Sequence, residues 1–126
     1  MRILPGEHLF VDGGPSWLLH GIYVGGGQVV APVFNGWTFS PVEQVAIESF
    51  LEEWMLMRVR RYAQPRYVGA AAVSRIMSRL GEEVDSDNGG LCAWAVTGSA
   101  HCAAHAYVDL PCEIDDAAQG GEPCPD

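Results

Sequence analysis

Two residues of this chain, Cys92 and His20, are of the types that form a thiol nucleophile and its base. A cysteine thiolate attacks a carbonyl carbon, and a histidine within hydrogen-bond reach takes the proton from the thiol. A helix N-terminus assists this chemistry, because its dipole lowers the pKa of a nearby thiol. Asp87, Asn88 and Gly89 predict a helix start just before Cys92.

A second group that could do chemistry is His101, Cys102 and His105. The histidine spacing places both imidazoles on one face of a helix, as in some zinc sites. Two imidazoles do not complete a zinc shell, and the cysteines that could add to it, Cys112 and Cys124, lie in an acidic C-terminal tail. We therefore expect no metal site and no cofactor, and we expect the two histidines to lie on a solvated helix face or to cap the helix end.

Two segments carry a family resemblance, residues 19–25 (LHGIYVG) and 87–98 (DNGGLCAWAVTG). They resemble the motifs His-x-Gly-Ile-Tyr-x-Gly and Asn-Cys-Glu-His-Phe-x-x-Trp-Cys-x-Thr-Gly of the H-box/NC thiol acyltransferases and phospholipases. That family contains lecithin:retinol acyltransferase and the HRAS-like suppressor proteins, and it is related to the NlpC/P60 cysteine peptidases. Including weaker similarities in order, the resemblance covers residues 6–98.

The resemblance implies three catalytic positions, and none of them holds a residue that can perform its role. The nucleophile position falls on Asn88, the general-base position on Leu19, and the position of the orienting histidine on Ala31. His20 is one residue away from the base position. A shift of one residue along a strand turns the side chain to the opposite face of the sheet, so we expect His20 not to replace the base. These positions predict a catalytically defective protein.

The alternative is a relocated dyad of His20 and Cys92. Cys92 lies four residues after Asn88, which is one helical turn along the same face, a displacement of about 6 Å. A bulge near residues 13–15 would shift the strand and bring His20 inward. The chain would then be a thiol acyltransferase or phospholipase.

The composition predicts one acidic, globular domain. The chain has 126 residues, 48% of them hydrophobic, and a net charge of -9, which disfavours nonspecific binding to nucleic acid. Its basic residues are all arginine, and four of them are close together in sequence: Arg58, Arg60, Arg61 and Arg66. We expect this arginine strip to bind an acidic or phosphorylated partner. The alternative is a solvated strand edge whose arginines are paired with carboxylates.

The pattern of apolar residues predicts an α+β fold, with a small antiparallel sheet and helices. The resemblance implies that they pack in the papain-like manner of NlpC/P60 relatives. We expect strands at 8–11, 20–25, 28–33 and 55–62, with a tight turn at the glycines 25–27. Ser40, Pro41 and Glu43 form a capping box that predicts a helix to about residue 53.

The second half predicts two further helices and a tail. Val73, Ile76, Met77 and Leu80 share one face of a helix over 70–80 that Gly81 ends. The apolar run 91–108 is interpreted as a buried helix and not as a membrane span. These elements assign residues 1–109 to the H-box/NC-like domain. The acidic residues 110–126 are expected to form a disordered tail.

A compact member of this family without an apolar C-terminal tail resembles the 2A proteins of picornaviruses, in particular the kobuvirus type. That resemblance implies binding to viral or host proteins and a part in viral RNA replication and assembly. Residues 1–6 are too short for a signal peptide, and the four cysteines match no disulfide scaffold. We therefore expect a location inside the host cytoplasm without an integral membrane span.

Overall fold

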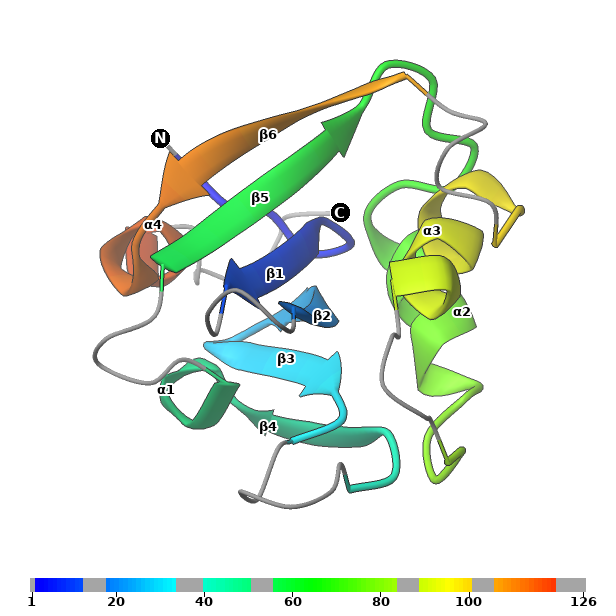
Figure 1. The fold of residues 1–126 in the computed structure, drawn as a ribbon, viewed down its shortest axis with the longest axis horizontal. Helices are drawn as coiled ribbons and strands as arrows, with labels where there is room; N and C mark the ends of the chain where they lie inside the picture. The colour runs from blue at the N-terminus through cyan, green and yellow to red at the C-terminus, as the bar shows by residue number, and fades with distance from the viewer. Residues whose placement is uncertain are drawn as a thin grey trace.

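The computed structural model describes residues 2–12, 18–33, 40–50, 56–83, 89–100 and 106–119 (Figure 1). In chain order its elements are β1 (His8–Asp12), β2 (Leu18–Gly25), β3 (Gln28–Ala31), β4 (Glu43–Ala46), α1 (Ile47–Phe50), β5 (Leu56–Tyr62), α2 (Ala70–Met77), α3 (Gly89–Thr97), β6 (Tyr107–Cys112) and α4 (Ile114–Gln119). The expected α+β class is confirmed.

Six strands form one open antiparallel sheet in the order β4-β3-β2-β1-β5-β6. The tight hairpin between β2 and β3 is confirmed. Its turn consists of Gly25, Gly26 and Gly27, with φ values of 94°, 62° and 75°. Residues other than glycine rarely adopt such angles, so this run of glycines fixes where the chain reverses.

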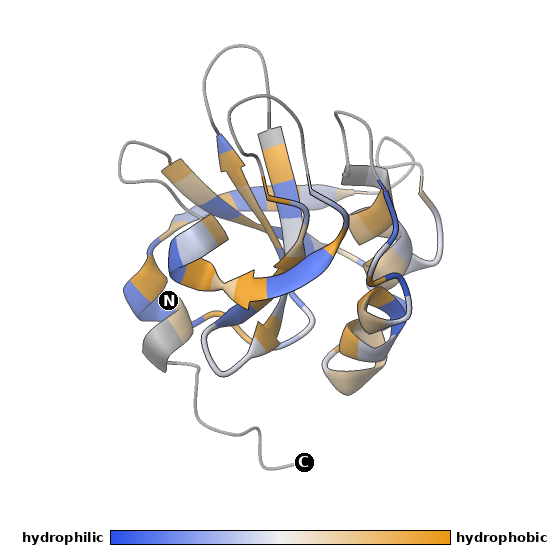
Figure 2. Cartoon of the chain, turned by 90° about the horizontal axis from the view of Figure 1, so that it is seen from below, coloured by the Kyte–Doolittle hydropathy of each residue, from blue (hydrophilic) through white to orange (hydrophobic). Residues whose placement is uncertain are grey.

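The two faces of the sheet are covered by different helices, α2 and α3 on one face and α1 and α4 on the other (Figure 1). Along each strand, alternate side chains point to opposite faces, and orange and blue segments follow one another along the strands in Figure 2. We call the two buried clusters the α1/α4 layer and the α2/α3 layer. The first contains Leu9, Val59 and Ala117, and the second contains Ile22, Ile76 and Cys92.

The helix expected over residues 40–53 is wrong for its described part. Residues 43–46 form β4, which pairs with β3, and only residues 47–50 are helical. The Ser40 hydroxyl accepts a hydrogen bond from the Val33 N–H at 2.9 Å, so it holds the start of β4 against the chain leaving β3. Without β4, the outer backbone N–H and C=O groups of β3 would have no strand to pair with. Pairing between β3 and β4 therefore outweighs the local capping signal.

The helix expected over residues 70–80 is shorter than predicted. α2 ends at Met77, and a turn follows to Gly81, whose φ is 86°. Ile76 is fully buried, as expected, but Leu80 lies beyond the helix and is 42% exposed. The assignment of Leu80 to the packed face is therefore wrong.

The interpretation of residues 91–108 as one helix is also wrong. α3 ends at Thr97, and the next residue, Gly98, has a φ of 85° and donates its N–H to the Trp94 carbonyl at 2.9 Å. Such a glycine is a common helix terminator. Tyr107 and Val108 belong to β6. Within the described ranges no helix is long and apolar enough to cross a membrane.

The expected disorder from residue 110 onward is wrong for residues 110–119. β6 crosses the boundary expected after residue 109 and pairs with β5 from Met57↔Cys112 to Tyr62↔Tyr107. α4 follows and buries Ala117 in the α1/α4 layer, where its carbonyl accepts a hydrogen bond from the Tyr23 hydroxyl at 3.2 Å. Small side chains such as Cys112 and Ala117 can pack closely in a core, although this segment has no long run of apolar residues. Residues 120–126 lie outside the described part of the chain.

Candidate functional site

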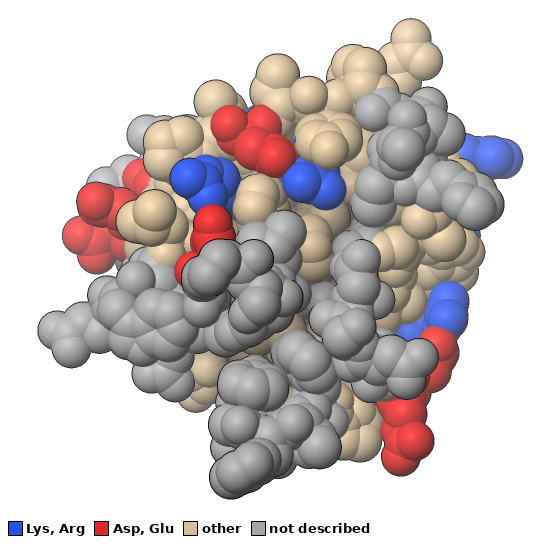
Figure 3. Space-filling model, in the orientation of Figure 1, with Lys and Arg blue, Asp and Glu red and all other residues tan. Residues whose placement is uncertain are grey.

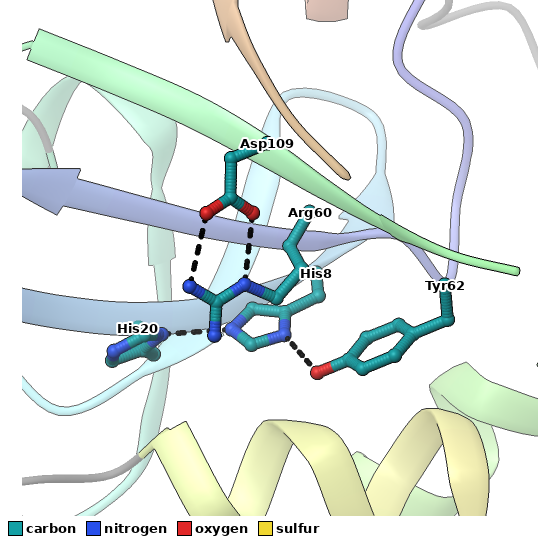
Figure 4. Close-up of polar contacts among 5 residues, drawn as sticks. All are labelled: His8, His20, Arg60, Tyr62 and Asp109. Atoms are coloured by element: carbon teal, nitrogen blue, oxygen red, sulfur yellow. Dashed lines mark hydrogen bonds and ion pairs between the residues drawn. The ribbon is translucent and has the colours of Figure 1, made fainter. Parts of the chain in front are cut away.

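Four polar side chains from three neighbouring strands point to the α2/α3 face of the sheet: His8 on β1, His20 on β2, and Arg60 and Tyr62 on β5. The register pairs His8 with both Ile22 and Arg60, and paired residues and those two apart on a strand share a face, so all four point to the side of Ile22, which packs in the α2/α3 layer. Figure 4 shows the two imidazoles and the phenol between the strands and a helix.

His8 is the centre of a buried hydrogen-bonded chain (Figure 4). Its Nε2 lies 2.8 Å from Nδ1 of His20, and its Nδ1 lies 2.9 Å from the Tyr62 hydroxyl. All three side chains are buried. The rings also contact one another, with centroid distances of 5.0 Å for His8–His20 and 5.9 Å for His8–Tyr62. We call these residues the Tyr62–His8–His20 chain.

Arg60 borders this chain and is itself held on several sides. Its Nε and Nη2 donate to the two carboxylate oxygens of Asp109, at 2.8 and 3.1 Å. The guanidinium carbon also lies 4.0 Å from the Tyr107 ring centroid and 4.9 Å from that of Phe10. A bidentate pair with stacked aromatic rings fixes both the position and the charge of the guanidinium.

Burial lowers the pKa of His8 well below its usual value, and the nearby His20 and Arg60 lower it further. Removing an imidazolium from water is costly, and two positive charges side by side repel each other. His8 is therefore neutral at pH 7.

When both imidazoles are neutral, two proton arrangements satisfy the chain. In one, His20 donates from Nδ1 to His8, and His8 donates from Nδ1 to the Tyr62 oxygen, so that Nε2 of His20 has no proton and is a base. In the other, Tyr62 donates to His8, His8 donates to His20, and Nε2 of His20 carries a proton. Whether Tyr62 accepts a hydrogen bond from His8 or donates one to it thus determines whether Nε2 of His20 carries a proton.

The family positions Leu19 and Ala31 are buried in the α1/α4 layer. His20 and Leu19 point to opposite faces of the sheet, as expected for neighbours on a strand, and it is His20 that faces the side of α3. His20 pairs with Phe10 in the β1–β2 register and shares its face with Ile22, which packs with Cys92 of α3. No slip of the strand is needed. Asn88 lies outside the described residues.

The arginine strip is not one surface. Arg58 and Arg60 face the α2/α3 side and pair with Asp12 at 3.8 Å and Asp109 at 2.8 Å. Arg61 points to the other side and pairs with Glu7 at 2.7 Å. Most blue groups visible in Figure 3 lie beside red ones.

Strand alternation therefore divides the arginines of β5 between two faces, and carboxylates pair with three of the four arginines. Binding of a partner by these arginines stays a prediction. Of the four, Arg66 alone has no ion pair with a described residue, and it is exposed.

The structure adds nothing to the metal hypothesis at His101, Cys102 and His105, which lie outside the described residues. Among the residues that are described, no group of three or more histidine, cysteine, aspartate or glutamate side chains could hold a metal ion. Cys112 is buried in the α1/α4 layer, and burial together with Asp116 and Glu7 raises its pKa to about 12.

A cavity of about 460 Å³ adjoins the Tyr62–His8–His20 chain at the end where β1 begins and β5 ends. Its lining comes from the start of the chain, the end of β5, the segment that leads to α2, and the end of α3: Leu4, Pro5, Gly6, Glu7, His8, Arg60, Arg61, Tyr62, Pro65, Tyr67, Val68, Gly69 and Val96.

Sequence reasoning missed His8 and Tyr62, although a signal was present. Leu9 and Val11 alternate with His8 and Phe10, and His20 and Ile22 alternate with Leu19. That alternation places a histidine on the same face of two consecutive strands. The pairing of β1 with β5, which brings in Tyr62, joins segments far apart in the chain and has no local signature.

Comparison with known proteins identifies no relative: no family model, curated protein or solved structure matches the chain.

Proposed function

We propose that this chain is an H-box/NC-type domain that lacks the family's catalysis and acts by binding viral or host proteins. The observation that supports this most directly is the burial of Cys92, which is 1% exposed. Its neighbours in the α2/α3 layer include Ala93 and Val96. Acyl transfer requires the sulfur to reach a substrate carbonyl, and a thiol in a packed apolar layer is inert unless the layer opens.

The three family positions support the same proposal. Leu19 and Ala31 have side chains without an ionisable group and lie on the far side of the sheet from α3. Asn88 has an amide where the family has a thiol. The papain-like arrangement of NlpC/P60 relatives is part of the proposal, supported by the packing of α3 against the H-box strand β2.

The biological role that we propose follows the 2A proteins of the kobuvirus type. In that role the domain supports viral RNA replication and assembly in the host cytoplasm through its protein partners. The motif order over residues 6–98 supports it. Binding requires a stable, shaped surface and no turnover, which agrees with a site whose polar groups are hydrogen-bonded to one another.

A second candidate function, thiol acyl transfer by His20 and Cys92, is favoured by one observation. Nδ1 of His20 is hydrogen-bonded to Nε2 of His8 at 2.8 Å. Thiol enzymes use a polar group in this way to orient the base toward the cysteine. The arrangement in which the Tyr62 oxygen accepts a hydrogen bond from Nδ1 of His8 leaves Nε2 of His20 without a proton and so makes His20 a base.

Peptide-resolved alkylation of the folded protein separates these candidates. We expect Cys92 to remain unmodified by iodoacetamide from about pH 6 to pH 9 and to react only after unfolding, because the thiol is buried. Replacing His20 with glutamine should not change this. Fast alkylation of Cys92 in the folded protein that depends on His20 would contradict the binding proposal.

Turnover and replication provide the direct test. A viral genome carrying Cys92→Ala should replicate like the parent, since the thiol has no chemical task and alanine fits the layer. The same substitution should not alter the behaviour of purified protein with acyl esters. Hydrolysis or transfer that disappears with Cys92→Ala would establish the relocated dyad.

A further inference from the structure

We propose that the cavity beside Tyr62 binds one uncharged, mostly apolar small molecule. Its volume is about 460 Å³. Pockets that bind drug-sized ligands are roughly 300–1,000 Å³. The inference is independent of the protein-binding role, because it rests on the cavity alone.

The cavity has apolar walls that include Leu4, Pro5, Val68 and Val96. Leu4 and Val68 are 45% and 64% exposed, so two large apolar side chains in the cavity lining are open to solvent. Covering such apolar surface removes it from water, which is favourable. An apolar ligand therefore gains free energy by entering.

Two glycines bring the walls together. Gly6 and Gly69 have positive φ values of 93° and 54°, and a Cβ on Gly6 would lie 2.8 Å from both the nitrogen and the oxygen of Gly69. The chain near the N-terminus can therefore approach the segment before α2 closely only without a side chain at this point. This contact is part of the preformed shape of the cavity.

The charged groups of the lining are already neutralised, which determines the class of ligand. The Glu7 carboxylate accepts from Nε of Arg61 at 2.7 Å and from the Leu4 N–H at 2.9 Å. Arg60 has its bidentate partner in Asp109. An anion would compete with Glu7 or Asp109, and a cation with the arginines, so a charged ligand would lose hydration without gaining an unpaired partner.

The polar groups at the end of the cavity near His8 already have hydrogen-bond partners. His8 is neutral, and both of its ring nitrogens have partners in His20 and Tyr62 (Figure 4). A ligand therefore meets no unpaired imidazole there, and affinity comes from its apolar body.

Two fluorescent probes of similar size test the proposal on the full chain. N-phenyl-1-naphthylamine is uncharged, and 8-anilinonaphthalene-1-sulfonate adds a sulfonate to the same ring system. We expect the uncharged probe to saturate one site and the sulfonate to bind at least about tenfold more weakly. Equal or tighter binding of the sulfonate, or no saturable binding of the uncharged probe, would overturn the proposal.

A matched pair of exposed substitutions locates the site. Val68→Lys places a charge in the cavity lining and should weaken the uncharged probe at least about tenfold. Leu56→Lys, at a residue of β5 outside the cavity that is 63% exposed, should leave it unchanged. Both residues are exposed, so both variants should fold, which a melting curve checks. Equal effects of the two substitutions would place the probe elsewhere and overturn the assignment.

Discussion

The two faces of the sheet are made by the same strands and differ in chemistry. On the α1/α4 face, Leu9, Leu19 and Val59 pack among apolar neighbours. On the α2/α3 face, His8, His20 and Arg60, each one position along the same strands, form hydrogen bonds or ion pairs. The comparison teaches that strand alternation lets one set of strands form both a core and a polar site. It also places Leu19, the family's base position, in the apolar core and the neighbouring His20 on the polar face.

The largest effect should come from removing β6, the outer strand beside β5, together with α4, which packs on the α1/α4 face. Deleting residues 107–126 removes β6 and α4, and with them the partners of β5 and the buried Ala117. We expect the shortened chain to lose cooperative unfolding, measured by circular dichroism. Deleting residues 113–126 retains β6 and should be milder. A deletion from 107 that melts like the parent would show that the face needs no such cover.

The second test concerns packing on the α2/α3 face. Ile76→Ala should lower the free energy of unfolding by roughly 2–5 kcal/mol, because it leaves a cavity at a fully buried position. Leu80→Ala, at a residue that is 42% exposed, should stay within about 0.5 kcal/mol. Denaturant titration of both variants measures the difference, and equal losses would mean that the turn after α2 is packed.

The third test concerns the ion pair beside the histidines. Arg60 has a side chain that is only 10% exposed and pairs with Asp109, so Arg60→Glu places two carboxylates together in a partly buried site. We expect a loss of about 3 kcal/mol. Arg66→Glu, at an exposed residue, should be neutral within about 0.5 kcal/mol. Charge reversal at Arg60 would thus mix a loss of stability with any loss of binding, so Arg66 is the better site for testing partners.

The smallest effect should be a dependence of stability on pH. The pKa of His8 is lowered in the folded protein, whereas the unfolded chain has an ordinary value near 6.5. Below about pH 6.5 the unfolded state therefore binds more protons than the folded state. As the pH is lowered, the free energy of unfolding should decrease by up to about 1.4 kcal/mol per pH unit, until the pH falls below the pKa of His8 in the folded protein. Above that range, the His8 contribution should be constant.

Urea denaturation between about pH 5 and pH 8 measures this dependence. A Tyr62→Phe variant retains both histidines and should keep the same acid dependence, while its overall stability falls because Nδ1 of His8 loses its partner. A parent protein whose stability is flat over this range would show that His8 is not held neutral.

Local patterns predicted the elements whose signals agree with their surroundings. The glycines at 25–27 located the hairpin, and the alternation of Met57, Arg58 and Val59 gave the strand and its buried side. The capping box at Ser40 was misleading, because β3 needed a partner along its edge. The site could be predicted only in part, since the meeting of His8, His20 and Tyr62 depends on pairing between strands that are distant in sequence.

The open sheet leaves β4 and β6 as its outer strands. Unpaired strand edges can add strands from other copies of a chain and so begin aggregation. β6 has Pro111 opposite Arg58, and a proline has no N–H to offer an incoming strand. β4 has an exposed Glu43 opposite Ala31, and a charge on an outer strand disfavours its pairing with a strand of another copy. Replacing Pro111 with valine should therefore make concentrated protein more prone to form fibrils, even if each molecule folds as before.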